Sequence, residues 1–227
     1  MSLIHRTTLS PTKLELLTQW LPGQPWYAGA GSGRQPEPAK AGGFRLDDPQ
    51  GEVGLEFMVV TDGSGETAVA YHVPLAYRAA PLTGAEHALI GTTEHGVLGK
   101  RWVYDGAHDP VLVAQLTAFV RGEARAQAQS VSDTPDPTVG RSWTGPAQAP
   151  AFGSGTVVDG PAGTTDVVLD GGPDGRLVLR VVRALRPGTH AAAEGGVLGH
   201  VDGRWQQPDG SEVRAVLATL HGGEPTA

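Results

Sequence analysis

The sequence predicts an α+β protein built mainly from antiparallel strands with a few short helices, and three observations lead to this fold class. Gly and Pro are abundant, with 33 and 18 among 227 residues, which favours turns over long helices. Several segments alternate apolar and polar residues, the pattern of a strand with one buried face. Two other segments repeat apolar residues with the helical period after a capping residue and a proline.

The first half of the chain is expected to run as a helix, a set of antiparallel strands and a second helix. Ser10 and Pro11 are a capping hydroxyl and a first-turn proline, and they predict a helix over residues 10–21. Asp109 and Pro110 repeat this start signal for a helix over residues 109–124, whose apolar stripe comprises Leu112, Leu116, Phe119 and Val120. Strands are expected at residues 43–47, 53–59, 67–75, 88–93 and 97–104.

A compositional change divides the chain into two predicted domains. Residues 131–150 are rich in Ser, Asp, Thr, Pro and Gly, and they are interpreted as a linker or long loop between domains at 1–130 and 151–227. In the second domain we expect strands at 156–158, 166–169 and 177–182, a helix at 191–199, and a final hairpin of 201–206 with 213–220. The strands of each domain are expected to form a sheet of their own.

Charge and composition narrow the classes of partner. The net charge is −7, from 17 Lys and Arg against 24 Asp and Glu, with no basic cluster of the kind that tracks a nucleic-acid backbone. Cysteine is absent, which excludes disulfides and thiolate metal sites. No apolar run reaches the length of a bilayer span, and the first residues lack a secretory signal. We therefore expect a cytoplasmic protein that binds neither nucleic acid nor membrane.

Two groups of residues suggest chemistry. His87 and His95 each follow a glutamate, but no third metal ligand is evident, so no metal site is predicted. Trp26 and Tyr27, close to Trp20, could stack on a sugar ring, although aromatic residues at a helix end more often pack into the core. Both interpretations of the aromatic residues stay open.

The aromatic segment carries a resemblance to a known family. Residues 20–29, WLPGQPWYAG, resemble the signature that opens the N-terminal cap of maltokinases, and residues 103–110, VYDGAHDP, resemble a later part of the same cap. The resemblance implies that residues 1–130 fold like a cystatin, with a helix packed on a curved antiparallel sheet. It gives a structural or interaction role to Trp20, Pro22, Trp26, Tyr27, Ala28, Gly29, Tyr104, Asp105, His108, Asp109 and Pro110.

The second half resembles a degenerate kinase small lobe, which implies a small antiparallel sheet with one helix. Residues 176–188 are similar to the third kinase strand of maltokinases, and the phosphate-binding lysine of that strand falls on Arg180. The helical glutamate that pairs with this lysine falls on Glu194. Nothing in the sequence matches the large lobe, which supplies the catalytic base and the Mg²⁺ ligands in such kinases. We therefore expect no catalytic residue, no cofactor and no enzymatic activity.

The resemblance implies a non-catalytic partner, regulatory or scaffolding protein in actinobacterial trehalose–maltose–glycogen metabolism. One alternative is a component of a sugar kinase that uses ATP and Mg²⁺ and is completed by another chain, and a second is a carbohydrate-binding module. A protein partner or a homodimer is expected, with a sugar as a further ligand to consider. Its interface is predicted around Val216, Leu217 and Leu220, which would face a large lobe in a full kinase.

Overall fold

The computed structural model describes residues 9–63, 65–129, 134–146, 155–170, 175–189 and 196–222, and within them it is mostly antiparallel sheet with two short helices. The helices are α1 (Lys13–Trp20) and α2 (Pro110–Arg121). The strands are β1 (Leu9–Ser10), β2 (Ala39–Leu46), β3 (Gly54–Asp62), β4 (Val69–Arg78), β5 (Leu89–His95), β6 (Gly99–Asp105), β7 (Gly140–Trp143), β8 (Gly155–Asp159), β9 (Thr164–Asp170), β10 (Arg176–Val182), β11 (Ala184–Leu185), β12 (Val197–Gln206) and β13 (Glu212–Gly222). The α+β class is confirmed, whereas the finer likeness to a cystatin and to a kinase small lobe stays a prediction.

The strands of the two halves are hydrogen-bonded into one path rather than into two separate sheets. The order is β1-β5-β6-β4-β3-β2-β12-β13-β10-β9-β8, with β11 paired to β4 and β7 paired to β12. β2 meets β12 at Gly42 and Trp205. A Cβ atom at Gly42 would lie 2.9 Å from the carbonyl oxygen of Arg204, so the missing side chain lets the two strands approach. The expectation of two independent sheets is therefore wrong.

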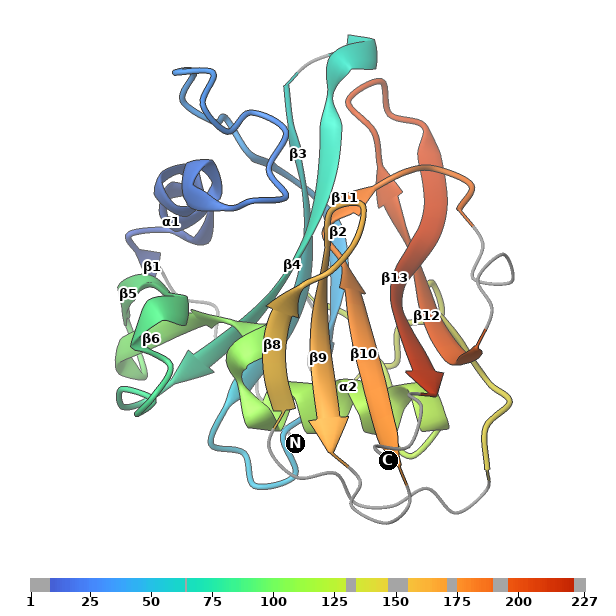
Figure 1. The fold of residues 1–227 in the computed structure, drawn as a ribbon. Coiled ribbons are helices and arrows are strands. Elements are labelled where there is room, and N and C mark those ends of the chain that lie inside the picture. The colour runs from blue at the N-terminus through green and yellow to red at the C-terminus, as the bar shows by residue number, and fades with distance from the viewer. Residues whose placement is uncertain are drawn as a thin grey trace.

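Helix α2 supplies a core that both halves share (Figure 1). Asp109 caps it by accepting hydrogen bonds from the backbone N–H groups of Val111 and Leu112, as the sequence predicts. The predicted stripe is buried in the larger of two apolar clusters, which also contains Phe57 from β3 and Leu179 from β10. Because α2 packs against strands from both halves, neither half buries its apolar face alone.

Helix α1 and strand β3 depart from their predicted details. Thr12, not Ser10, caps α1, because Thr12 and Glu15 form a reciprocal capping box at the first turn. β3 is buried on both faces, whereas its alternation predicts one buried face. Phe57 packs in the α2 cluster, and Met58 packs in a second cluster with α1 residues such as Leu17.

Two predicted connections are also corrected. The proposed linker at 131–150 contains β7, whose four residues pair with β12, so part of it belongs to the sheet. The helix expected at 191–199 is wrong for its described part, because β12 begins at Val197. Residues 190–195 lie outside the described residues, and the domain boundaries themselves stay a prediction.

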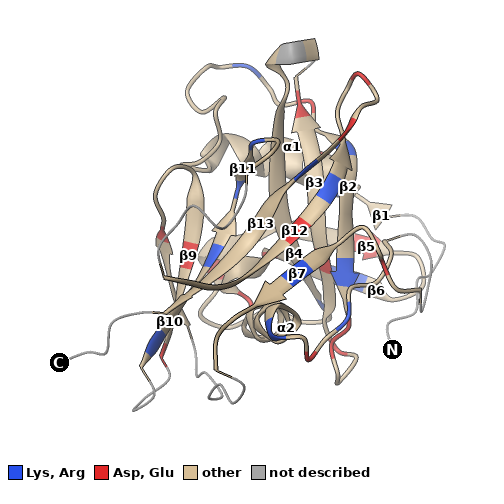
Figure 2. Cartoon of the chain, turned by 90° about the vertical axis from the view of Figure 1, so that its right-hand side faces the viewer, with Lys and Arg blue, Asp and Glu red and all other residues tan. Residues whose placement is uncertain are grey.

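Neither helix in the described ranges is both long and apolar enough to cross a bilayer. Lys and Arg are interspersed with Asp and Glu over the side of the molecule that Figure 2 presents. Cross-strand pairs such as Arg204 with Glu212 and Arg214 with Asp202 join β12 to β13 there. The charges on this side are therefore locally balanced.

Candidate functional site

Two aromatic residues of the first motif, Trp26 and Tyr27, are buried, whereas Trp20 is half-buried. Trp26 and Tyr27 are 8% and 3% exposed. Trp20 meets the Trp26 ring edge-on with centroids 5.6 Å apart, and the Tyr71 ring lies 5.9 Å from Trp26 and 5.3 Å from Tyr27. Other aromatic side chains lie against the rings of Trp26 and Tyr27, which favours the core-packing interpretation of these two residues.

The rest of this motif fastens its loop to β3 and β4. The Tyr27 hydroxyl donates to Asp62 at 2.6 Å, and burial together with this carboxylate raises the pKa of Tyr27 to about 12. The backbone N–H of Ala28 donates to the Tyr71 hydroxyl. A Cβ atom at Gly29 would lie 2.6 Å from the Tyr27 ring, so only glycine fits there. The exposed Pro22 is the middle residue of the 3-10 turn Leu21–Gly23 that follows α1.

A buried ion pair joins the second cap motif, residues 103–110, to the second half of the chain. Arg183, which follows β10, has no exposed surface, and its Nη2 donates to both carboxylate oxygens of Asp105 at 2.8 and 2.7 Å. Its Nε donates to Thr165 at 2.9 Å, and its guanidinium carbon lies 5.2 Å from the centroid of the Trp26 ring. Both cap motifs therefore contact one arginine of the second half, which sequence reasoning did not single out.

His72 completes this group, and we refer to Trp26, His72, Asp105, Thr165 and Arg183 as the Arg183 cluster. His72 is fully buried on β4, and its Nδ1 lies 3.3 Å from the carbonyl oxygen of Val182. Burial and the neighbouring Arg183 lower the pKa of His72 from 6.5 to about 3, so the imidazole is neutral at physiological pH. Among the described residues, His72 Nε2 and Arg183 Nη1 have no hydrogen-bond partner.

The second motif organises the start of α2. The Tyr104 hydroxyl accepts the backbone N–H of Leu82 at 2.8 Å. Asp109 has no exposed surface, and besides capping the helix it accepts from Arg78 Nε and Nη2 at 2.5 and 3.1 Å. Pro110 occupies the first turn of the helix. In the described molecule the side-chain polar atoms of Tyr104 and Asp109 form hydrogen bonds with other parts of the same chain.

Arg180, at the position that the resemblance gives to the phosphate lysine, is engaged by an acidic neighbour. Its Nε and Nη2 donate to the two carboxylate oxygens of Asp166 at 2.8 and 2.9 Å, and the two residues are cross-strand partners on β10 and β9. Glu194, the other nucleotide-site candidate, lies outside the described residues. The guanidinium of Arg180 is therefore already paired with a carboxylate from the adjacent strand β9.

The predicted interface residues are not on the surface. Val216, Leu217 and Leu220 are 6%, 2% and 0% exposed, and β13 lies between β12 and β10 in the sheet. Leu217 and Leu220 belong to the cluster around α2. Their apolar character is explained by the chain's own core, so this interface is corrected: these side chains do not face a partner.

A cleft lies beside α2. It has a volume of about 770 Å³ and is lined by α2, by β8 and β9, and by loops that carry His87 and His108. His87 Nε2 lies 3.2 Å from His108 Nδ1, and burial lowers the pKa of His108. At the other end, Arg121 is paired with Glu123 at 2.7 Å. No group of three or more metal-ligating side chains occurs in the described part of the chain.

The sequence points to four residues that line this cleft, His87, His108, Asp109 and Pro110, and not to the others. His108, Asp109 and Pro110 were singled out through the cap motif, and all three line the cleft. Thr117 and Arg121 were not, although they repeat on α2 at a spacing of four residues, away from the predicted apolar stripe. The opposing wall from β8 and β9 could not have been paired with α2 from sequence alone.

The comparison with family models matches a segment that begins in the first motif and ends in the second. Residues 20–109, less than half of the chain, match the maltokinase N-terminal cap domain. No match to this chain was found among the curated proteins. The chain therefore contains a maltokinase cap-like domain, and the matched segment ends at Asp109, immediately before α2.

Proposed function

We propose that this maltokinase-related chain is not catalytic and acts by binding, as a partner, regulatory or scaffolding protein in trehalose–maltose–glycogen metabolism. The observation that carries the non-catalytic part is the cross-strand pair of Arg180 and Asp166. A lysine in a phosphoryl-transfer site must meet the negative phosphate oxygens of the nucleotide. Here the cation is an arginine with a different geometry, and a carboxylate already accepts two of its N–H groups.

The cap-like domain supports a binding role rather than a reactive one. Its motif residues are used for packing and for the Arg183 cluster, where Asp105 and Trp26 hold the second half of the chain. An ATP- and Mg²⁺-dependent kinase component completed by another chain remains the alternative. It requires Arg180 to leave Asp166 and meet phosphate.

Mg-ATP titration by isothermal calorimetry tests this proposal. We expect no saturable binding by the purified chain, and no phosphate transfer to maltose, glucose or glucosamine. Arg180→Met is the test variant, and Arg214→Met is its matched control, because Arg214 forms a similar cross-strand pair with Asp202 on β13 and β12. Saturable Mg-ATP binding that Arg180→Met weakens and Arg214→Met leaves intact would support the kinase-component alternative instead.

The binding role has its own measurement. The chain carrying an affinity tag at its native locus should elute from native cells as a complex larger than its 23.5 kDa mass. Elution as a monomer from native extracts, measured by size exclusion with light scattering, contradicts a constitutive partner role.

A further inference from the structure

Helix α2 presents to the cleft a face that overlaps the shared core at Val113. The residues of this face recur with the helical period and are Pro110, Val113, Ala114, Thr117, Ala118 and Arg121. The cleft volume of about 770 Å³ lies within the range of small-molecule sites, which are mostly apolar with a few placed polar groups. This face therefore has the size and the mixture of groups that a small ligand requires.

Thr117 is the first placed polar group. It lines the cleft, it is 4% exposed, and its Oγ1 has no hydrogen-bond partner among the described residues. A buried hydroxyl without a partner costs free energy, and such groups are rare enough in folded proteins to need an explanation. Because this oxygen has almost no accessible surface as it stands, a polar atom of a ligand would supply the missing partner once the Thr117 side chain turns toward the cleft.

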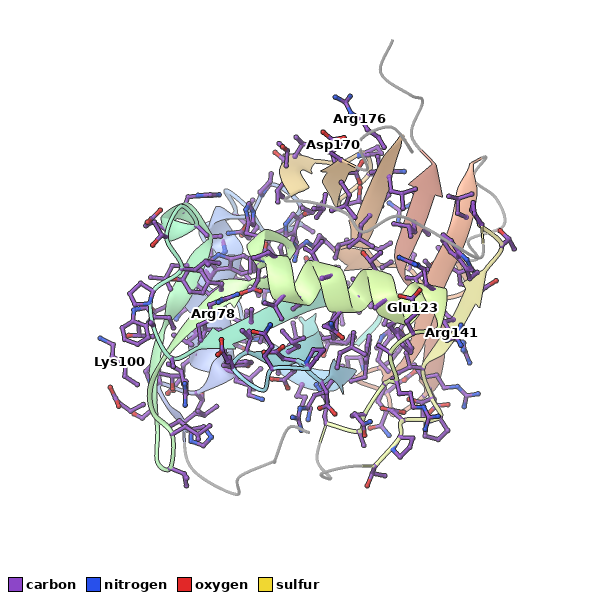
Figure 3. The ribbon with its side chains drawn as sticks, turned by 90° about the horizontal axis from the view of Figure 1, so that it is seen from below. Arg78, Lys100, Glu123, Arg141, Asp170 and Arg176 are labelled. Carbon is purple, nitrogen blue, oxygen red and sulfur yellow. The ribbon has the colours of Figure 1, made fainter. Side chains whose placement is uncertain are left out.

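Arg121 is the second placed polar group, and it stands one helical turn beyond Thr117. Four residues on a helix correspond to about 6 Å, so the hydroxyl and the guanidinium can be reached by one small polar group. Glu123, which now pairs with Arg121, has a side chain that is 51% exposed. Glu123 lies at the far end of α2 from Arg78 (Figure 3). Glu123 also lines the cleft, so a ligand carboxylate must displace this exposed side chain before it accepts hydrogen bonds from the Arg121 guanidinium and the Thr117 hydroxyl.

The remainder of the cleft suits an aliphatic chain. Val113, Val157, Val167 and Leu169 line it, and apart from the imidazoles of His87 and His108 no aromatic ring lines it within the described ranges. Sugars and nucleobases are usually held by aromatic stacking, which this lining does not offer. From Arg121 back to Val113 the helix rises about 12 Å, which matches an extended acyl chain of about ten carbons.

We propose that the α2 cleft binds a medium-chain aliphatic carboxylate. The carboxylate sits between Thr117 and Arg121, and the chain runs along β8 and β9 toward His108. This assignment is independent of the proposed function, because it involves neither Arg180 nor a protein partner.

Calorimetric titration with sodium decanoate, below its micelle concentration, tests the assignment on the full chain. We expect saturable one-to-one binding that Thr117→Val and Arg121→Met each weaken about tenfold, the loss of one charge-assisted hydrogen bond. Ala118→Phe should abolish binding by filling the cleft. Arg204→Met is the matched control, because it breaks an Arg–Glu pair on β12 and β13 away from the cleft, and it should leave binding unchanged.

Decan-1-ol separates recognition of the carboxylate from apolar partitioning. It should bind more weakly than decanoate, and Arg121→Met should not change its affinity. The assignment is wrong if the wild-type chain shows no saturable decanoate binding up to about 1 mM. It is also wrong if Thr117→Val and Ala118→Phe, folded by circular dichroism, bind decanoate like wild type. The Thr117 and Ala118 variants decide the question even if Arg121→Met does not fold.

Discussion

Replacing Arg183 with methionine tests whether the Arg183 cluster fastens the cap-like domain to the second half. The substitution removes the guanidinium and keeps a flexible apolar side chain of similar length. It leaves the Asp105 carboxylate, which is 5% exposed, without its two hydrogen bonds from Arg183. It also removes the partner of Thr165 and the cation above Trp26.

The expected loss follows from leaving a buried charge unpaired. Removing one partner of a buried ion pair typically costs about 3–5 kcal/mol of folding free energy. For a chain of this size, each kcal/mol corresponds to about 2–4 °C in Tm, so Arg183→Met should lower Tm by about 6–20 °C. In the double variant Arg183→Met with Asp105→Asn, neither member of this pair is charged. Its loss should therefore fall short of the sum of the two single losses by about 1–3 kcal/mol.

Urea unfolding followed by tryptophan fluorescence measures all three variants, with calorimetry for Tm. Arg204→Met is the control, because the pair of Arg204 with Glu212 is exposed on both sides and should contribute less than about 1 kcal/mol. A loss below about 1 kcal/mol for Arg183→Met, or strictly additive losses in the double variant, would refute the interlocking role of Arg183.

Three further predictions concern other parts of the fold. The free energy of unfolding should fall by up to ~1.4 kcal/mol per pH unit as the pH drops from 6.5 toward about 3, because the His72 imidazole is protonated in the unfolded chain and stays neutral in the folded one. Urea unfolding at several pH values should show a smaller dependence of this free energy on pH for His72→Asn. Leu220→Ala should lower the free energy of unfolding by about 2–5 kcal/mol in the same assay, because the side chain is fully buried. An unchanged free energy of unfolding would contradict the burial of Leu220. Gly122→Ala should lower the free energy of unfolding by about 1–2 kcal/mol, because Gly122 has φ 87° and a Cβ atom there would meet the Arg141 guanidinium. A thermal scan with an unchanged Tm would contradict this.

The sequence predicts local elements well where one physical signal dominates. The Asp109 cap, Pro110 and the apolar stripe of α2 agree with the structure because capping and burial favour the same helix. The start of α1 is misplaced because Ser10 and Thr12 are both capable caps. Only the hydrogen bond that the Thr12 backbone N–H donates to the Glu15 carboxylate distinguishes them, and Glu15 lies three residues further along the chain.

Pairing over long distances could not be predicted in the same way. Periodicity gives the buried face of a strand but not the strand that covers it, so the contact of β2 with β12 at Gly42 and Trp205 leaves no local signal. For the same reason Val216, Leu217 and Leu220 suggested an open surface when they are core. The sequence does not distinguish Arg183 from its basic neighbours, because a charged side chain is predicted to be exposed unless its buried partner is known.

The shared position of α2 has a consequence for how the chain acquires its structure during translation. The helix is complete at Arg121, but strands that cover its apolar side include β13, which ends at Gly222. About a hundred further residues must leave the ribosome first, which takes about 5–20 s at ordinary elongation rates. During this interval Leu112, Leu116 and Phe119 have only the first half to shelter them. We therefore expect that slowed translation between α2 and β13 raises the fraction of nascent chains that aggregates.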